Sequence, residues 1–121
     1  MRDTILHEWV CGLPGDRSVV VVSLLGKKPK GKNEWSYYSF YETGRSFQDW
    51  LDQHYKEKAI QVIEHQTCDM RPIPNTVLMA VSFDIMKLLC EARTIVLMDS
   101  GGEVRVQQVC KYMGAVCLNR V

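Results

Sequence analysis

Three short apolar runs predict buried strands. Residues 18–25 contain four consecutive valines and two leucines and are apolar on both faces, which is typical of a strand inside a sheet. Residues 60–65 and 94–98 form similar runs, and segments of helical periodicity separate the three. Because strands that alternate with helices favour parallel pairing through right-handed crossovers, we expect these runs to share a parallel sheet.

Two further strands are predicted nearer the N-terminus. Residues 5–11 form a short apolar segment that stops at the Gly and Pro residues of 12–15, and residues 34–41 carry five aromatic side chains. The connecting residues 26–33 are rich in Gly, Lys and Pro. This pattern predicts a β-hairpin between residues 18–25 and 34–41.

The remaining apolar residues recur at helical spacing. An amphipathic helix is predicted after Ser46, which is a suitable N-cap. A second helix is predicted from Asn75 to about Glu91, and because it is apolar almost all round we expect it to be mostly buried. A third follows the glycine-rich turn after residue 98 and ends at Gly114.

These elements predict an α/β fold in a single domain covering residues 1–121. The expected architecture is a small mixed sheet, with an N-terminal β-hairpin and a parallel βαβα C-terminal half. The formal net charge of the 121 residues is only +1, so the chain has no overall attraction for nucleic acid or membranes. No apolar run is long enough to cross a bilayer and no signal segment is visible, so we expect a cytoplasmic location and no membrane partner.

A glycine-rich turn between a strand and a helix is the most specific motif of the chain. Residues 99–105 read Asp-Ser-Gly-Gly-Glu-Val-Arg and follow the apolar run at 94–98. Unpaired N–H groups at a helix N-terminus favour an anion, and an arginine side chain adds a planar fork of donors. The residues of this predicted anion loop are Asp99, Ser100, Gly101, Gly102, Glu103 and Arg105.

Residues 46–116 resemble the core of the dual-specificity and tyrosine phosphatase superfamily. In that family a strand ends in His-Cys, and five residues, an arginine and a helix follow; Asp99 and Arg105 keep this spacing, with Ser100 and Gly102 in the Ser-x-Gly core. The family also has an upstream loop with a general-acid aspartate, often followed by prolines. Asp69, which precedes Pro72 and Pro74, matches that position. The resemblance implies a phosphatase-like C-terminal half.

Asp99 stands where the family has its nucleophilic cysteine. A thiolate activated by the loop N–H groups attacks phosphorus in that family, and a carboxylate cannot replace it in the same way. A carboxylate about 4 Å from a bound phosphate would repel it by roughly 4 kcal/mol at an effective dielectric near 20, and Glu103 adds to the repulsion. We therefore expect an inactive relative without catalytic residues. In the favoured interpretation Asp99 accepts N–H bonds from its own turn and pairs with Arg105.

Two alternatives remain open. Asp99 could accept a phosphoryl group itself, although no acidic pair for magnesium stands beside it. Alternatively, the basic hairpin loop, with Lys27, Lys28, Lys30 and Lys32 beside the aromatic residues of 34–41, could bind single-stranded nucleic acid or a phosphate ligand. Lysine-rich hairpin loops are more often solvated or protect a sheet edge.

The sequence favours a non-catalytic binding or interaction module over an enzyme. Its expected partner is a protein or a phosphorylated ligand at the modified anion loop. The five cysteines form no C-x-x-C pair and the histidines show no ligand spacing, so neither a metal site nor a cofactor is expected. The oligomeric state and the identity of the partner stay open.

Overall fold

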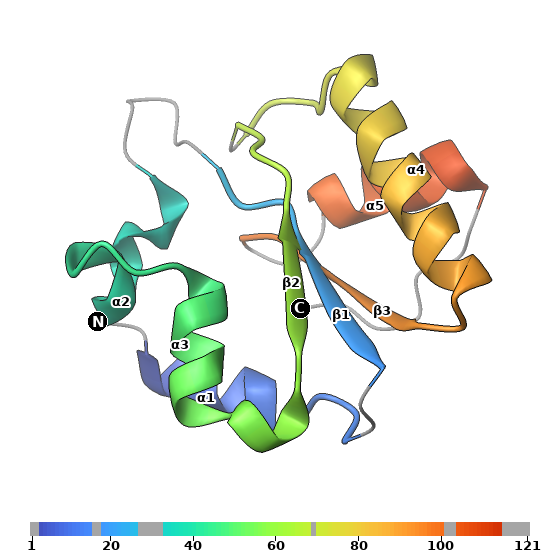
Figure 1. The fold of residues 1–121 in the computed structure, drawn as a ribbon. Helices are drawn as coiled ribbons and strands as arrows, with labels where there is room; N and C mark the ends of the chain where they lie inside the picture. Colours follow the sequence, from blue (N-terminus) through green and yellow to red (C-terminus); the bar gives the residue numbers. More distant parts are fainter. Residues whose placement is uncertain (1–2, 16–17, 27–32, 69, 101–103, 115–121) are drawn as a thin grey trace.

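The centre of the fold is a three-stranded parallel sheet. The computed structural model describes residues 3–15, 18–26, 33–68, 70–100 and 104–114 (Figure 1). The strands are β1 (Val19–Ser23), β2 (Gln61–Glu64) and β3 (Thr94–Met98), in the order β2-β1-β3. Val21 of β1 is in register with Val62 of β2 and Val96 of β3. The predicted apolar runs at 18–25, 60–65 and 94–98 are therefore confirmed as parallel strands.

Helical segments connect the strands. The α-helices are α1 (Asp3–Cys11), α2 (Ser39–Glu42), α3 (Phe47–His54), α4 (Asn75–Cys90) and α5 (Val104–Met113). Two short 3-10 helices, η1 (Glu34–Tyr37) and η2 (Lys56–Lys58), precede α2 and β2. The helices at 46–55, at 75–91 and before Gly114 are confirmed. Ser46 caps α3 by accepting the Asp49 N–H, and Gly114 has the positive φ of +69° that suits the residue after a helix.

Helices cover both faces of the sheet. α4 and α5 lie on one face, and α1 and α3 lie on the other (Figure 1). Along β1, Val19 and Val21 pack toward α1 and α3, whereas Val20 and Val22 pack toward α4 and α5. All four valines are completely buried. A central parallel strand covered on both faces explains why this run is apolar at every position.

The two strands predicted nearer the N-terminus are helical instead. Residues 5–11 belong to α1, and residues 34–41 form η1 and the start of α2. The predicted N-terminal hairpin is therefore wrong, and the sheet is purely parallel within the described residues rather than mixed. In α1 the buried residues Leu6 and Val10 are four positions apart, which is a helical spacing. The apolar run is so short that this spacing was not recognised in the sequence.

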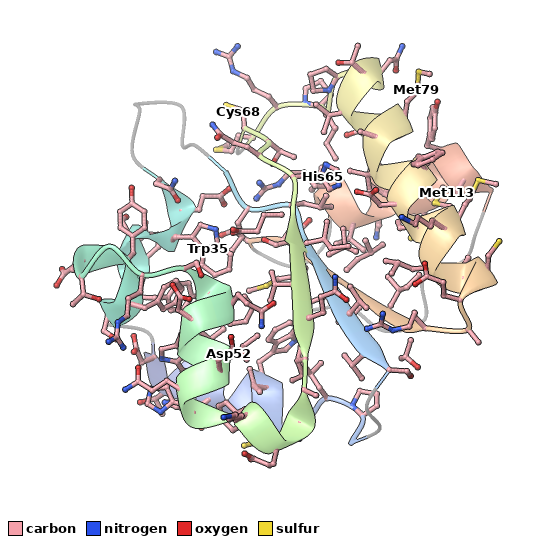
Figure 2. The ribbon with its side chains drawn as sticks, viewed as in Figure 1. Trp35, Asp52, His65, Cys68, Met79 and Met113 are labelled. Atoms are coloured by element: carbon pink, nitrogen blue, oxygen red, sulfur yellow. The ribbon has the colours of Figure 1, made fainter. Side chains whose placement is uncertain are left out.

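Aromatic packing explains the second of these errors. The ring of Phe47 on α3 lies 5.1 Å from the Trp35 ring and 6.0 Å from the Phe40 ring, centroid to centroid. Asn33 also accepts the Trp35 N–H through its side chain and so caps η1. Trp35 and Phe40, which belonged to the predicted strand, therefore form a cluster against a helix. Figure 2 shows Trp35 on the α3 side of the sheet, with Met113 on the opposite side.

The burial predicted for α4 is also wrong. Leu78, Val81, Ile85 and Leu88 are buried against the sheet and α5. The side chains on the other face, Met79, Phe83, Met86 and Leu89, are 58–70% exposed. The narrow sheet offers α4 one contact face only, and no other described element covers the opposite face.

Candidate functional site

The carboxyl ends of the three strands place the predicted anion loop. Parallel strands end at a common edge, and ligands of open α/β sheets bind in the crevice outside that edge. β1 continues into Leu24 and Gly26, β2 continues toward Thr67, and β3 continues into Asp99 and Ser100. Arg105 follows in the first turn of α5. Segments from four parts of the sequence therefore converge around Arg105.

The Arg105 guanidinium is held inside the protein. Its two terminal nitrogens donate to the two carboxylate oxygens of Glu34, at 2.7 Å and 2.9 Å. It also donates to the Leu24 carbonyl at 2.9 Å and to Thr67 Oγ1 at 2.7 Å. Arg105 is 3% exposed and Glu34 is 2% exposed. The planar donor fork that could bind a phosphate is therefore used in a buried, bidentate ion pair.

Gly26 allows the loops around this ion pair to meet. Its N–H donates to Glu34 Oε1 at 2.9 Å, and its carbonyl accepts the Glu34 N–H at 2.8 Å. A Cβ atom at this position would lie 1.9 Å from the Thr67 carbonyl oxygen. Only glycine permits this approach. The backbone of the β1 exit loop thus helps to fix the carboxylate that pairs with Arg105.

Asp99 caps α5 instead of pairing with the Arg105 side chain. Its Oδ2 accepts the backbone N–H groups of Arg105 and Val106, each at 3.0 Å. The expectation that Asp99 accepts N–H bonds is confirmed, whereas the expected pairing with the Arg105 guanidinium is wrong because Glu34 occupies that fork. Asp99 is 5% exposed, and its Oδ1 is buried without a hydrogen-bond partner among the described residues.

A small pocket adjoins Asp99 on the side of α1 and η1. Its volume is about 250 Å³, and Asp99 and Ser100 belong to its lining. Aromatic side chains on its walls are Trp9, Tyr37 and Tyr38. We call this cavity the Asp99 pocket. It combines an apolar and aromatic wall with a buried carboxylate.

A larger groove lies on the other side of Ser100. It has a volume of about 670 Å³ and runs between residues 70–72 and the exposed side of α5, where Val104 and Lys111 line it. Gln108 of α5 fixes the loop beside it, because its side chain accepts the Ile73 N–H at 2.8 Å and donates to the Ile73 carbonyl at 3.0 Å. The loop that follows the predicted general-acid position is therefore fastened to α5.

A third hollow of about 410 Å³ lies at the end of β2. Glu64, Trp35 and Arg45 are among the residues that line it. Burial raises the pKa of the Glu64 carboxyl above its usual value, and a hydrogen bond from the Trp35 side chain offsets part of this rise. All three hollows thus open along the carboxyl edge of the sheet.

Only part of the predicted site lies within the described residues. The structure brings Asp99, Ser100 and Arg105 together at this edge. The remaining predicted positions lie outside the described residues; they are Gly101, Gly102, Glu103, Asp69, Lys27, Lys28, Lys30 and Lys32.

Sequence reasoning missed the residues that complete the Arg105 network. Glu34 lies 71 positions before Arg105 and stood in a segment predicted as a strand, so no local spacing could reveal it. Thr67 lies 38 positions before Arg105 and belongs to no motif. The only available signal for a partner was the requirement that a buried arginine be matched by a carboxylate.

Within the described part of the chain, no group of three or more His, Cys, Asp or Glu side chains is arranged to hold a metal ion. The described helices also include none with the length and apolar character needed to span a bilayer.

No protein-family model matches the chain, and searches of curated proteins and of solved structures find no similar protein.

Proposed function

We propose that this chain is a non-catalytic binding domain. In this proposal the segment from β3 to α5 resembles the anion loop of the tyrosine phosphatases but does not perform phosphoryl transfer. The observation that carries the proposal is that Asp99 and Arg105 are both committed to contacts inside the fold.

Phosphate chemistry at this loop would need two groups that are already engaged. A phosphoryl ligand needs the guanidinium fork, but Arg105 is 3% exposed and binds both oxygens of Glu34. A phosphate would have to displace that buried carboxylate and would then meet the negative charge of Asp99. Removing a partner from a buried pair leaves an uncompensated charge, which is strongly unfavourable.

The hollows at the carboxyl edge of the sheet support binding instead. Ser100 lines both the Asp99 pocket and the larger groove between residues 70–72 and α5, and each has an apolar wall beside a few polar groups. This combination is typical of ligand sites, in which apolar contacts supply affinity and a few polar groups orient the ligand.

The proposal is tested by assaying hydrolysis of p-nitrophenyl phosphate by the purified protein, with and without Mg²⁺. We expect no turnover above buffer. Asp99→Cys restores a thiol but leaves Arg105 paired with Glu34, so we expect little or no activity from that variant either. Thermal unfolding with millimolar phosphate serves as a binding control, and we expect no stabilisation.

Turnover by the wild-type protein that Asp99→Asn abolishes would contradict the proposal and support a phosphoryl-transfer role for Asp99. Strong stabilisation by millimolar phosphate would also contradict it, because the loop would then be a working anion site.

A further inference from the structure

The outer face of α4 carries a concentrated set of exposed apolar side chains. Four of the ten large hydrophobic residues that are exposed in the described structure lie on this one helix, each 58–70% exposed; they are Met79, Phe83, Met86 and Leu89. Figure 2 shows Met79 on the side of α4 that is turned away from the sheet. None of the four lines any of the three hollows at the carboxyl edge, so this face is separate from the proposed binding site.

The spacing of these side chains is typical of a seam along which two helices pack. Exposed residues follow one another at intervals of four, three and four, at Met79, Phe83, Met86 and Cys90. We call these four residues the outer seam. Apolar residues that recur every 3.5 positions on average are the residues that pack two helices together. The buried residues on the opposite side of α4 show intervals of three, four and three, at Leu78, Val81, Ile85 and Leu88. The helix therefore has two packing seams, and the described elements cover only one of them.

The area of the outer face fits an interface between two copies of the chain. Since a fully buried large side chain removes about 200 Å² from water, the four exposed ones offer on the order of 500 Å² per copy. Two copies would bury about 1,000 Å² from these side chains alone, close to the roughly 1,200 Å² at which stable interfaces begin. Ala80, Cys90 and the stem of Lys87 are also exposed on α4 and add to this area. The face is therefore large enough for a reversible dimer.

The charges on α4 favour a second copy as the partner. The helix has two charged residues, and neither belongs to the outer seam: Asp84 contacts His65 at 2.6 Å, and Lys87 flanks the seam. In an antiparallel pair, Lys87 of one helix lies beside Ala80 of the other, so no like charges meet. The formal net charge of +1 leaves little repulsion between two copies, and a strongly acidic or basic partner would find no complementary charge along the seam.

We infer that α4 is a self-association surface, on which the outer seam of one copy packs antiparallel against the outer seam of a second copy. Two-fold symmetry then places Phe83 against the partner's Met86, and Met79 against the partner's Cys90. The macrodipoles of the two helices oppose each other in this arrangement, which is the favourable orientation. Because α4 is already held by its own sheet, it loses little conformational freedom on pairing.

Sedimentation velocity of the wild-type chain under reducing conditions, from about 1 µM to 1 mM, tests the inference. We expect a reversible monomer–dimer equilibrium with a dissociation constant of about 1–100 µM, because the interface lies at the small end of the stable range. Phe83→Glu puts a charge in the middle of the outer seam and should weaken dimerisation at least about tenfold. The matched control is Ile5→Glu, at a position 62% exposed on α1 across the sheet, which should leave dimerisation unchanged.

A pair of variants with complementary charges tests the antiparallel register. Met86→Lys alone should also weaken dimerisation. Mixing it with Phe83→Glu should restore association, because the antiparallel heterodimer pairs the introduced carboxylate with the introduced ammonium and keeps one native contact between Phe83 and Met86. We expect the mixture to associate at least about tenfold more tightly than either variant alone. In a parallel pair, equivalent positions face each other, and mixing would give no recovery.

A wild-type chain that stays monomeric at the highest concentration overturns the inference. In that case, resistance of Met79 and Met86 to oxidation by hydrogen peroxide would show that another part of the chain covers the face, and ready oxidation would leave the face to a different protein. Equal dimerisation by wild type and Phe83→Glu, or no recovery on mixing, also overturns it. Far-UV circular dichroism checks that each variant is folded, and the wild-type measurement decides the question if a variant is not.

Discussion

At the residue scale, Arg105 is a structural side chain, buried in a bidentate ion pair with Glu34. An arginine in an open loop can bind an anion from solution. Here the carboxylate of Glu34, which belongs to the fold, binds both terminal nitrogens of Arg105. The intramolecular carboxylate loses no translational freedom on binding, unlike a free phosphate. The pair also connects η1, the exit loops of β1 and β2, and α5.

Removal of the Arg105 side chain should therefore be costly. We expect Arg105→Ala to lower the free energy of unfolding by about 3–5 kcal/mol, because it leaves Glu34 buried without its counter-ion. The double variant Glu34→Leu with Arg105→Met should recover much of this loss, since it replaces both charges with apolar groups. Urea denaturation of the three proteins measures the effect. A stable Arg105→Ala protein would show that the arginine is not a structural brace.

Glu64 gives a prediction for pH dependence at the same scale. Burial raises the folded-state pKa of this carboxyl above the ordinary value of 4.5, so the folded protein prefers its protonated form. The associated stability is present below the unfolded-state value and is lost as the pH rises through the folded-state pKa.

The variant Glu64→Gln stays neutral and can still accept the Trp35 hydrogen bond. We expect it to gain stability relative to wild type between pH 4 and pH 7, by less than about 1 kcal/mol because the side chain is partly exposed. Thermal unfolding of both proteins at the two pH values provides the measurement. A stability difference that is the same at both pH values, or that favours wild type at pH 7, would contradict the assigned pKa direction.

At the scale of elements, α4 shows that apolar composition does not decide which face is buried. Ile85 is 6% exposed, whereas Phe83, two positions earlier, is 70% exposed. Both are large and apolar, and they differ only in the side of the helix that they occupy. Because an α-helix has 3.6 residues per turn, positions two apart lie on nearly opposite sides of it. Only the side that faces a neighbouring element is then buried.

The two positions should respond very differently to truncation. We expect Ile85→Ala to cost about 2–5 kcal/mol, because it opens a cavity against the sheet. Phe83→Ala should change stability by no more than about 0.5 kcal/mol, since it removes an exposed ring and improves helix propensity. Urea denaturation at low protein concentration compares the two. Equal costs would show that the exposed face of α4 is covered in solution.

At the scale of the whole molecule, the parallel sheet determines where side chains from distant segments come together. Because β1, β2 and β3 run in the same direction, their exit loops meet at one edge, and the three hollows lie along that edge. Glu34 and Arg105 are far apart in sequence and become partners only through this arrangement. The same arrangement places a carboxylate beside an aromatic pocket.

The sequence by itself determined the elements whose signal is local. The valine run of β1, the Ser46 cap of α3 and the glycine that ends α5 each depend on neighbouring residues, so their patterns could be interpreted without the fold. The sequence also indicated that Asp99 would accept N–H groups of its own turn, because a side chain so close to a helix start has those donors nearby.

Only the tertiary structure decided the features that depend on distant neighbours. Trp35 and Phe40, two of the aromatic residues of the predicted strand at 34–41, pack on Phe47 of α3, and a local pattern cannot reveal that contact. The exposed face of α4 follows from the narrow sheet beneath it. The partner of Arg105 is Glu34 because loop packing brings the carboxylate of Glu34 to the guanidinium, whereas Asp99 is used by the backbone of α5. Long-range packing therefore places Arg105 in a buried ion pair with Glu34, a partner that no local pattern indicated.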